Sequence, residues 1–289
     1  MRKGMQTTDF HLYERGFKSR TDDWKITSIE KLKNIDKYLM KNKDIEVWLD
    51  SGDFFHTTHQ GTKLINSVIK TFKNFKRQDI FPIIAIAGNH ITKRNAEKFI
   101  GESGLKTLES CGYIKIVEDP HIGKYGDRKI MMNHISVVPE PVIWEHSTYK
   151  EIDEMSSVDY FLCSHEHTPQ PVTTVGTTTF IAPGSLSRGT GSEKNHYRDP
   201  AIAVFTLEGK KEVEYVPIMK DSFPFVEKSV SVDIEANSSA LVDKINNVWN
   251  DYEKSSMDFT KIVEHFRNSD DSFDNNVLNY CLDVKERLE

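Results

Sequence analysis

Four short apolar runs, rich in β-branched and aromatic residues, recur within the first 165 residues of this chain. Runs of this kind are typical of buried central strands. We therefore predict four strands, at residues 45–50, 80–87, 128–135 and 158–164.

Apolar residues at helical spacing surround the first of these runs. Trp24, Ile29, Leu32 and Leu39 recur within residues 24–41, and a similar stripe runs from Leu64 to Phe75. The resulting β-α-β-α alternation indicates an α/β fold.

The pattern changes from residue 176. Residues 176–186 and 200–218 read as strands, the latter as a hairpin that turns at Glu208 and Gly209. An α/β part followed by a β-rich part fits a sandwich of sheets flanked by helices.

After about residue 222 the composition shifts again. Residues 229–289 carry 6 Lys and Arg against 13 Asp and Glu, with one alternating strand pattern at 230–234 followed by helical stripes. We predict two domains: a catalytic domain over 1–222 and a small acidic capping or partner-binding region over 223–289.

Composition excludes several classes of protein. The chain has 289 residues, of which 37% are apolar and 28% charged, and it has no run of roughly 18 apolar residues that would suggest a membrane span. The first residues do not resemble a secretion signal, so we expect a cytoplasmic protein that makes no membrane contact. The three widely spaced cysteines fit reduced thiols: Cys111, Cys163 and Cys281.

Charge is distributed unevenly along the chain. Residues 1–100 carry 19 Lys and Arg against 12 Asp and Glu, whereas residues 101–289 carry 19 against 32. The first third is therefore the side expected to face a polyanion.

Carboxylates, amides and imidazoles follow the predicted strands with regularity. Five places along the chain offer such side chains, and oxygen and nitrogen ligands of these types suit Mn, Fe or Zn rather than a thiolate-bound metal. In an extended segment, Asp9 and His11 share a face and can reach one ion. Two ions close together activate water for in-line attack on phosphorus. The five places are Asp9-x-His11, Gly52-Asp53-x-x-His56, Gly88-Asn89-His90, His134 and His165-x-His167.

This ordered set resembles the calcineurin-like metallophosphoesterases over about residues 5–190. The resemblance implies an α/β fold, a four-layer sandwich of two mixed β-sheets flanked by helices, with a small α+β appendage at the C-terminal end. It implies two divalent metal ions, with Mn²⁺ expected first and Fe²⁺, Zn²⁺ or Mg²⁺ as alternatives. One ion would be held by Asp9, His11, Asp53 and His167, and the other by Asp53, Asn89, His134 and His165. Asp53 would bridge them, and His90 would act on the scissile phosphate as a catalytic residue.

Residues 180–189, FIAPGSLSRG, resemble the Pro-Gly-Ser segment of the SbcD-type DNA repair exonucleases. This resemblance implies DNA as substrate, in DNA end processing, repair or recombination, and an SMC-like ATPase subunit of the SbcC type as partner. Residues 257–267 and 273–288 either bind that ATPase or complete the cap. A second copy of the chain, in a homodimer, is a separate possible partner. Two other functions stay open: a small-molecule phosphodiesterase or nucleotide phosphatase, and a module that binds DNA ends or a partner nuclease.

The chain departs from the family pattern at three positions. Ile91 stands where Asp is usual, Ser164 replaces the usual Gly before the last histidine pair, and His56 stands where the nuclease branch mostly has Asp. None of these changes removes a predicted ligand, although His56 is expected to alter the surroundings of Asp53.

Overall fold

The computed structural model describes residues 1–57, 59–85, 103–138, 147–189, 195 and 198–219. The chain divides into two units, Met1–Val226 and Glu227–Glu289, and every described residue belongs to the first. The predicted boundary after residue 222, the C-terminal strand and the helical stripes all lie outside the described residues.

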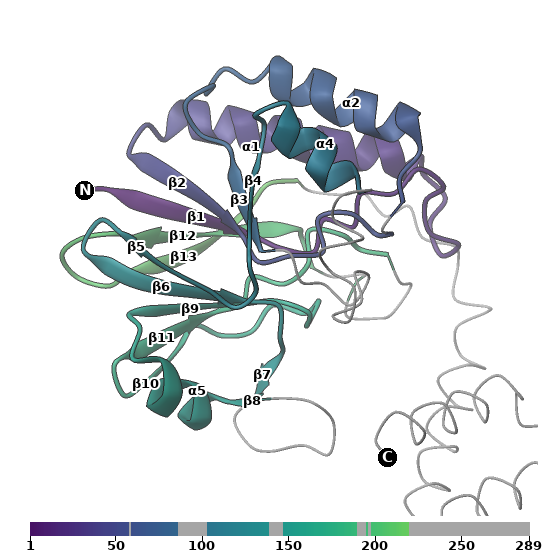
Figure 1. The fold of residues 1–289 in the computed structure, drawn as a ribbon. Helices are drawn as coiled ribbons and strands as arrows, with labels where there is room; N and C mark the ends of the chain where they lie inside the picture. The colour runs from purple at the N-terminus through teal and green to yellow at the C-terminus, as the bar shows by residue number, and fades with distance from the viewer. Residues whose placement is uncertain (58, 86–102, 139–146, 190–194, 196–197, 220–289) are drawn as a thin grey trace, which may run out of the picture. The chain divides into compact units, whose positions relative to one another are not determined.

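A six-stranded mixed sheet forms the centre of the first unit (Figure 1). Its order is β13-β12-β1-β2-β3-β4, with β1 to β4 parallel and β12 antiparallel to both β1 and β13. The strands are β1 (Lys3–Thr7), β2 (Ile45–Asp50), β3 (Pro82–Ala85), β4 (Lys115–Val117), β12 (Ala201–Thr206) and β13 (Val213–Pro217).

A second mixed sheet of five strands has the order β10-β11-β9-β6-β5. Strands β6, β9 and β11 run parallel, and the two edge strands pair antiparallel with their neighbours. The strands are β5 (His121–Tyr125), β6 (Arg128–Asn133), β9 (Tyr160–Cys163), β10 (Thr173–Val175) and β11 (Thr178–Ile181). A separate short pair joins β7 (Val137–Val138) to β8 (Ser147–Thr148).

Helices cover the outer faces of both sheets (Figure 1). Helix α1 (Trp24–Lys41) begins where the Asp23 side chain accepts a hydrogen bond from the Ile26 amide, a normal helix cap. Helices α2 (Thr62–Lys73) and α4 (Gly104–Ser110) lie beside it, and α5 (Tyr149–Ser156) lies on the five-stranded sheet, beginning in a capping box at Thr148 and Glu151.

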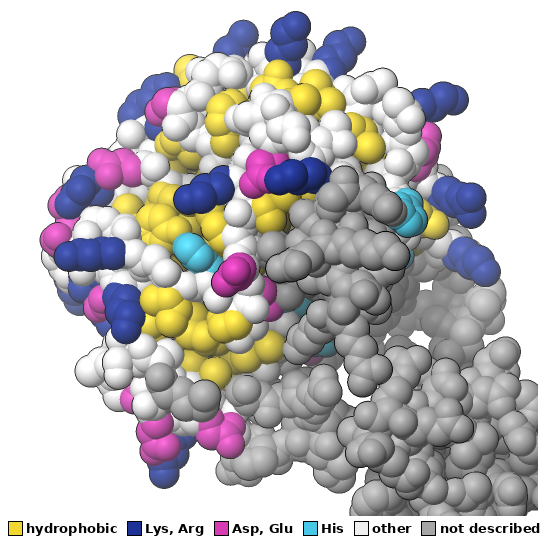
Figure 2. Space-filling view, viewed as in Figure 1, with side chains coloured by type: hydrophobic (Ala, Val, Ile, Leu, Met, Phe, Trp, Pro, Cys, Tyr) yellow, Lys and Arg dark blue, Asp and Glu magenta, His cyan; other side chains and the backbone are white. Residues whose placement is uncertain are grey.

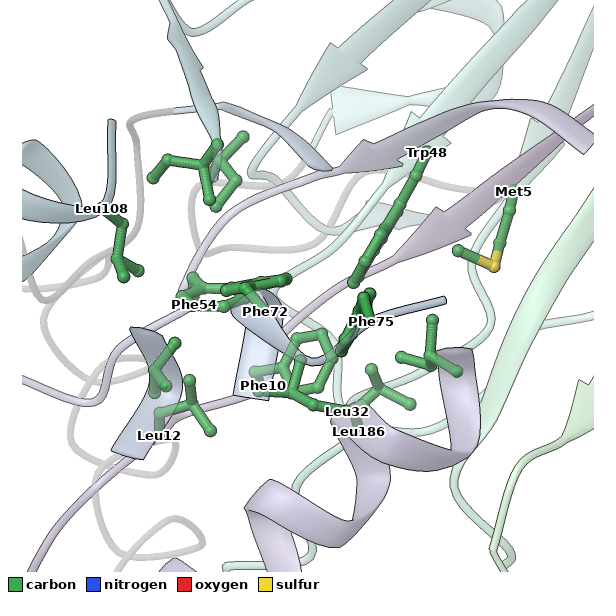
Figure 3. Packing of buried hydrophobic residues seen from close by; sticks show 14 of the residues in the cluster. Met5, Phe10, Leu12, Leu32, Trp48, Phe54, Phe72, Phe75, Leu108 and Leu186 are labelled. Carbon is green, nitrogen blue, oxygen red and sulfur yellow. The ribbon is translucent and has the colours of Figure 1, made fainter. Parts of the chain in front are cut away.

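Three apolar clusters match these layers. The largest packs α1, α2 and α4 on the six-stranded sheet, and in it the Trp48 and Phe75 rings stack with centroids 6.3 Å apart (Figure 3). A second cluster lies between the sheets and includes Leu49 and Tyr160. A third packs Ile152 of α5 against the other sheet. The predicted sandwich of two mixed sheets flanked by helices is therefore confirmed.

The predicted strands at 45–50, 128–135 and 158–164 contain β2, β6 and β9, and the predicted hairpin is formed by β12 and β13. Of the run 80–87, β3 occupies Pro82–Ala85, and residues 86–87 lie outside the described residues. The change of pattern at residue 176 does not separate the two sheets, because β12 pairs with β1 and returns the chain to the first sheet. Sequence periodicity did not indicate this long-range pairing.

Cys111 and Cys163 are both free thiols, and Cys281 lies outside the described residues. Among the helices in the described part of the chain, none is long and apolar enough to cross a membrane.

Candidate metal centre

Asp9 and His11 lie in the loop that follows β1. Both have left-handed backbones, with φ of 50° and 45°. The prediction that Asp9 and His11 lie on an extended segment is therefore wrong. They are instead placed by hydrogen bonds to the neighbouring loop, from the Asp9 amide to Gly52 O at 3.0 Å and from the His11 amide to Asp53 O at 2.9 Å.

Asp53 follows β2 through a tight turn. Gly52 has φ 115°, a conformation that requires glycine, and its amide donates to Asp50 Oδ1 at 3.1 Å. Asp53 itself has φ 50°. The loops after β1 and β2 are thus joined at the carboxyl edge of parallel strands, where α/β sheets bind ligands.

The remaining histidines follow two strands of the other sheet. His134 comes directly after β6, and its amide donates to Asp119 Oδ1 at 3.1 Å. His165 and His167 follow β9, and the His165 amide donates to Asp9 Oδ2 at 3.3 Å. The site therefore lies where the corresponding ends of the two sheets meet.

One group of ligand atoms surrounds Asp9 Oδ1. The Nε2 atoms of His11 and His167 each lie 3.5 Å from that oxygen and 3.2 Å from one another. Together with Asp9 they could hold one metal ion.

A second group of ligand atoms is buried and comes from the loops of both sheets. His134 Nε2 lies 3.3 Å from Asp53 Oδ2 and 3.9 Å from Asp9 Oδ1. Asp9, Asp53 and His134 could hold a further ion. Asp9 belongs to both groups, whereas the family resemblance assigns the bridging role to Asp53. Asp53 also lies between the groups, with Oδ2 3.8 Å from His11 Nε2.

The chemistry of these side chains fits divalent ions. Asp9 Oδ1 and His134 Nε2 are buried without a hydrogen-bond partner in the described part of the chain, an arrangement that is costly unless something else binds them. Carboxylate and imidazole ligands suit Mn, Fe or Zn.

Electrostatics support the same conclusion. Burial raises the pKa of Asp9, but the close imidazoles of His11 and His167 and the charge of His134 outweigh it and hold the pKa well below its usual range. Burial lowers the pKa of His134, yet the nearby carboxylates of Asp53 and Asp9 outweigh burial and raise it to about 9. The carboxylates of Asp9 and Asp53 thus favour positive charge at His134, as they would favour a bound cation.

Backbone strain is concentrated at this site. Five described non-glycine residues have positive φ, and four of them are predicted ligands: Asp9, His11, Asp53 and His165. Asp and His tolerate this region better than most residues, but each such position costs on the order of 1–3 kcal/mol. Strain of this kind accumulates where function requires it.

Two predicted residues, Asn89 and His90, lie outside the described residues. His165 is absent from both ligand groups found among the described residues, and its ring centroid lies 5.5 Å from that of His134. Burial lowers the pKa of His165. His56 contacts His11, with their Nδ1 atoms 3.3 Å apart.

Asp50 ends a predicted strand and Ser164 departs from the family pattern, but neither residue was predicted to have a role in the site. Asp50 is fully buried and accepts a hydrogen bond from Thr7 Oγ1 at 2.6 Å. Its Oδ1 also accepts the hydrogen bond from the Gly52 amide that stabilises the turn after β2. Burial, together with the charge of Asp9, raises the pKa of Asp50 to about 8, and the hydrogen bonds from Thr7 and Gly52 only partly offset this rise. The signal for Asp50 was its place before Gly52 and Asp53, and the signal for Ser164 was its replacement of the usual Gly before His165.

The sequence model of the calcineurin-like phosphoesterase family matches residues 5–169. The chain belongs to this family, and its fold and site define a metal-dependent phosphoesterase. No match was found among the curated proteins.

Several solved structures are similar to the chain. A predicted phosphoesterase from Streptococcus pneumoniae TIGR4 is 14% identical, with a TM-score of 0.42 over 77% of this chain and 93% of that one. A zinc complex of Vps29 from Entamoeba histolytica is 14% identical, with a TM-score of 0.37 over 75% and 99%. Vacuolar Protein Sorting 29 from Cryptosporidium parvum is 14% identical, with a TM-score of 0.39 over 74% and 96%.

Proposed function

We propose that this protein is a two-metal phosphodiesterase that degrades DNA from its ends, with Mn²⁺ as the working ion. The observation that carries the choice of DNA is a basic, acid-free stretch that starts at the metal centre. Residues 54–78 follow Asp53 directly and contain five Lys and Arg but no Asp or Glu.

The exposed face of α2 supplies most of this charge. Lys63, Lys70 and Lys73 are exposed, while Leu64, Val68 and Phe72 on the opposite face are buried. Lys and Arg side chains stand along the upper edge of the view in Figure 2, where α1 and α2 lie. A helix of 12 residues is about 18 Å long, which is enough to follow several phosphates of a DNA strand.

The carboxylates that contact this stretch lie before and after α2. Glu14 approaches Gly61 just before the helix, and beyond it Asp36 Oδ1 accepts from the Lys76 and Arg77 amides and Asp79 pairs with Arg77 at 2.9 Å. On α1, by contrast, Lys33 and Lys37 both lie close to Glu30. The face of α2 is therefore the better match for a polyanion.

The segment that resembles the SbcD-type exonucleases forms hydrogen bonds with the loop that contains the ligand Asp9. The Leu186 amide donates to Thr8 O and the Ser187 amide to Asp9 O, each at 3.1 Å. Ser185 Oγ donates to Asp9 O at 2.8 Å. These contacts position Asp9, so they support metal binding without selecting a substrate.

In the proposed reaction, bound divalent ions supply Lewis-acid stabilisation of the phosphoryl charge and activate the water nucleophile. Asp9, Asp53, His11, His134 and His167 hold the ions, with Asn89 and His165 completing the proposed set. His90 donates a hydrogen bond to the scissile phosphate and assists the leaving oxygen. The lysines of α2 hold the DNA backbone beyond the cleaved bond.

The test follows an end-labelled linear duplex incubated with the protein and Mn²⁺. Wild type should shorten the DNA from an end, and Asp53→Asn should leave it intact. A triple variant, Lys63→Gln, Lys70→Gln and Lys73→Gln, should weaken DNA binding and reduce the salt slope by about 3, since each phosphate contact contributes about 0.9. Its hydrolysis of an aryl phosphodiester should be unchanged.

The matched control neutralises the same number of lysines on α1: Lys33, Lys37 and Lys41, each to Gln. Equal loss of DNA binding in both triple variants would remove α2 from the proposal. Hydrolysis of the aryl phosphodiester with intact DNA would replace the nuclease with a small-molecule phosphodiesterase. Tight DNA binding without any hydrolysis would make the protein a binding module.

A further inference from the structure

Ser164 is a buried residue that lies between the ends of three strands. Its Oγ is 2.9 Å from Ser51 O, 3.0 Å from His134 Nδ1 and 3.3 Å from Asn133 O. Ser51 follows β2, Asn133 ends β6, and Ser164 itself follows β9. One hydroxyl thus connects three segments of chain that are distant in sequence.

Each of these segments carries a predicted metal ligand. Ser51 lies two residues before Asp53, Asn133 directly precedes His134, and Ser164 directly precedes His165. Asp53, His134 and His165 are the described members of the ligand set that the family resemblance assigns to one ion.

The contacts of His134 Nδ1 determine where the ring carries its hydrogen. Nδ1 lies 3.0 Å from Ser51 O, and a carbonyl oxygen can only accept, so Nδ1 must carry a hydrogen. The Ser164 hydroxyl donates to a carbonyl oxygen, so its own oxygen also faces Nδ1 as an acceptor. With a hydrogen held on Nδ1, loss of the other ring proton leaves the lone pair on Nε2, the atom that lies 3.3 Å from Asp53 Oδ2.

We propose that Ser164 is a positioning residue for the half of the metal centre formed by Asp53, His134 and His165. The hydroxyl holds the Ser51 carbonyl and the His134 ring in one arrangement, which keeps Nε2 available for an ion. This inference rests on the proposed two-metal function and adds a residue-level cause for the affinity of one of the two ions.

The other half of the centre is held by different contacts. Ser185 Oγ donates to Asp9 O, and the Ser185 amide donates to His167 O at 3.1 Å. Within the described part of the chain, Ser164 makes no hydrogen bond to these groups. Loss of its hydroxyl should therefore affect one ion more than the other.

The experiment is calorimetric titration of the full-length, metal-free protein with Mn²⁺. Wild type should show two binding events, and His134→Ala should abolish the event that belongs to this half. Ser164→Ala should weaken the same event by about 10- to 100-fold, the usual effect of removing a group that orients a ligand. The other event should change by less than about threefold.

Two further variants separate positioning from general stability. Ser164→Thr keeps the hydroxyl, so its affinity should lie closer to that of wild type than the affinity of Ser164→Ala does. Thr178→Val removes another buried hydroxyl, which donates to Val158 O at 3.0 Å in the same sheet. It should leave both events unchanged.

Equal weakening of both events by Ser164→Ala, or no weakening, would overturn the inference while leaving the two-metal function in place. A wild-type protein that binds no Mn²⁺ would remove both. If Ser164→Ala does not fold, nitrogen-15 NMR of the zinc-loaded wild type decides: hydrogen on Nδ1 of His134 supports the inference, and hydrogen on Nε2 overturns it.

Discussion

Asp9 Oδ1 and His134 Nε2 lie 3.9 Å apart in the buried centre of the site, and neither atom has a hydrogen-bond partner among the described residues. The first follows β1 of the six-stranded sheet, and the second follows β6 of the other sheet. Two buried polar atoms left unbonded would each cost about 1–3 kcal/mol. A cation bound between them removes that cost, which is why this pair is central to the predictions below.

Replacing Asp53 by Asn should abolish both metal binding and hydrolysis. The amide is neutral and presents only one oxygen, so the ligand group with Asp9 and His134 loses a negative charge. Activity on an aryl phosphodiester should fall at least about 100-fold, because even residues that only hydrogen-bond to a metal ligand change metal affinity or activity by about 10–100-fold. Metal content measured by atomic spectroscopy should fall with it. Glu154→Gln, an exposed control on α5, should match wild type. An Asp53→Asn protein with full activity and metal content would refute the site.

Metal affinity should rise with pH up to about 9. His134 has a pKa of about 9 in the metal-free protein, and its Nε2 must lose a proton before it can bind an ion. Below that pH, affinity should fall about tenfold for each pH unit because one proton is displaced. Calorimetry in buffers of different ionisation enthalpy should detect the released proton. An affinity independent of pH between 6 and 8 would show that His134 is not a ligand.

Asp50→Asn should stabilise the metal-free protein at alkaline pH. The folded-state pKa of Asp50 is about 8, above its ordinary value of 3.8, chiefly because of burial. The contribution of this carboxyl to stability is therefore complete below pH 3.8 and is lost as the pH rises through 8.

Relative to Asp50→Asn, wild type should lose on the order of 1 kcal/mol per pH unit between pH 4 and 8. Denaturant unfolding of both proteins at pH 5 and pH 9 measures the difference. Parallel stability profiles would mean that Asp50 is ionised in the folded protein.

Lys31→Met should destabilise the fold and loosen the loop that holds Asp9. Lys31 is almost fully buried, donates to Leu186 O at 2.8 Å and lies 4.5 Å from the centre of the Trp24 ring. Removing this charged donor should cost about 2–4 kcal/mol of unfolding free energy. Lys33→Met, on the exposed side of the same helix, should stay within about 0.5 kcal/mol of wild type. Equal effects would show that burial of Lys31 contributes nothing.

Local sequence patterns were sufficient for the strands and for the list of candidate ligands. The run from Ile45 to Asp50 is a strand because its apolar residues pack into the core on both faces of the sheet, and α2 is a helix because Leu64, Val68 and Phe72 recur every four residues. The motif aspartates and histidines follow such elements directly, so their order along the chain indicated the family.

Only the tertiary structure determined which strands pair and which loops hydrogen-bond to one another, because sequence periodicity carries no information on either. Pairing of β12 with β1 put the C-terminal hairpin into the first sheet, and hydrogen bonds between loops, such as that from the Asp9 amide to Gly52 O, set the left-handed backbone of Asp9. The Ser164 hydroxyl reaches Ser51 O, 113 residues away in sequence. Periodicity reports only which face of one element is buried, whereas the metal centre depends on hydrogen bonds between elements that are far apart in the chain.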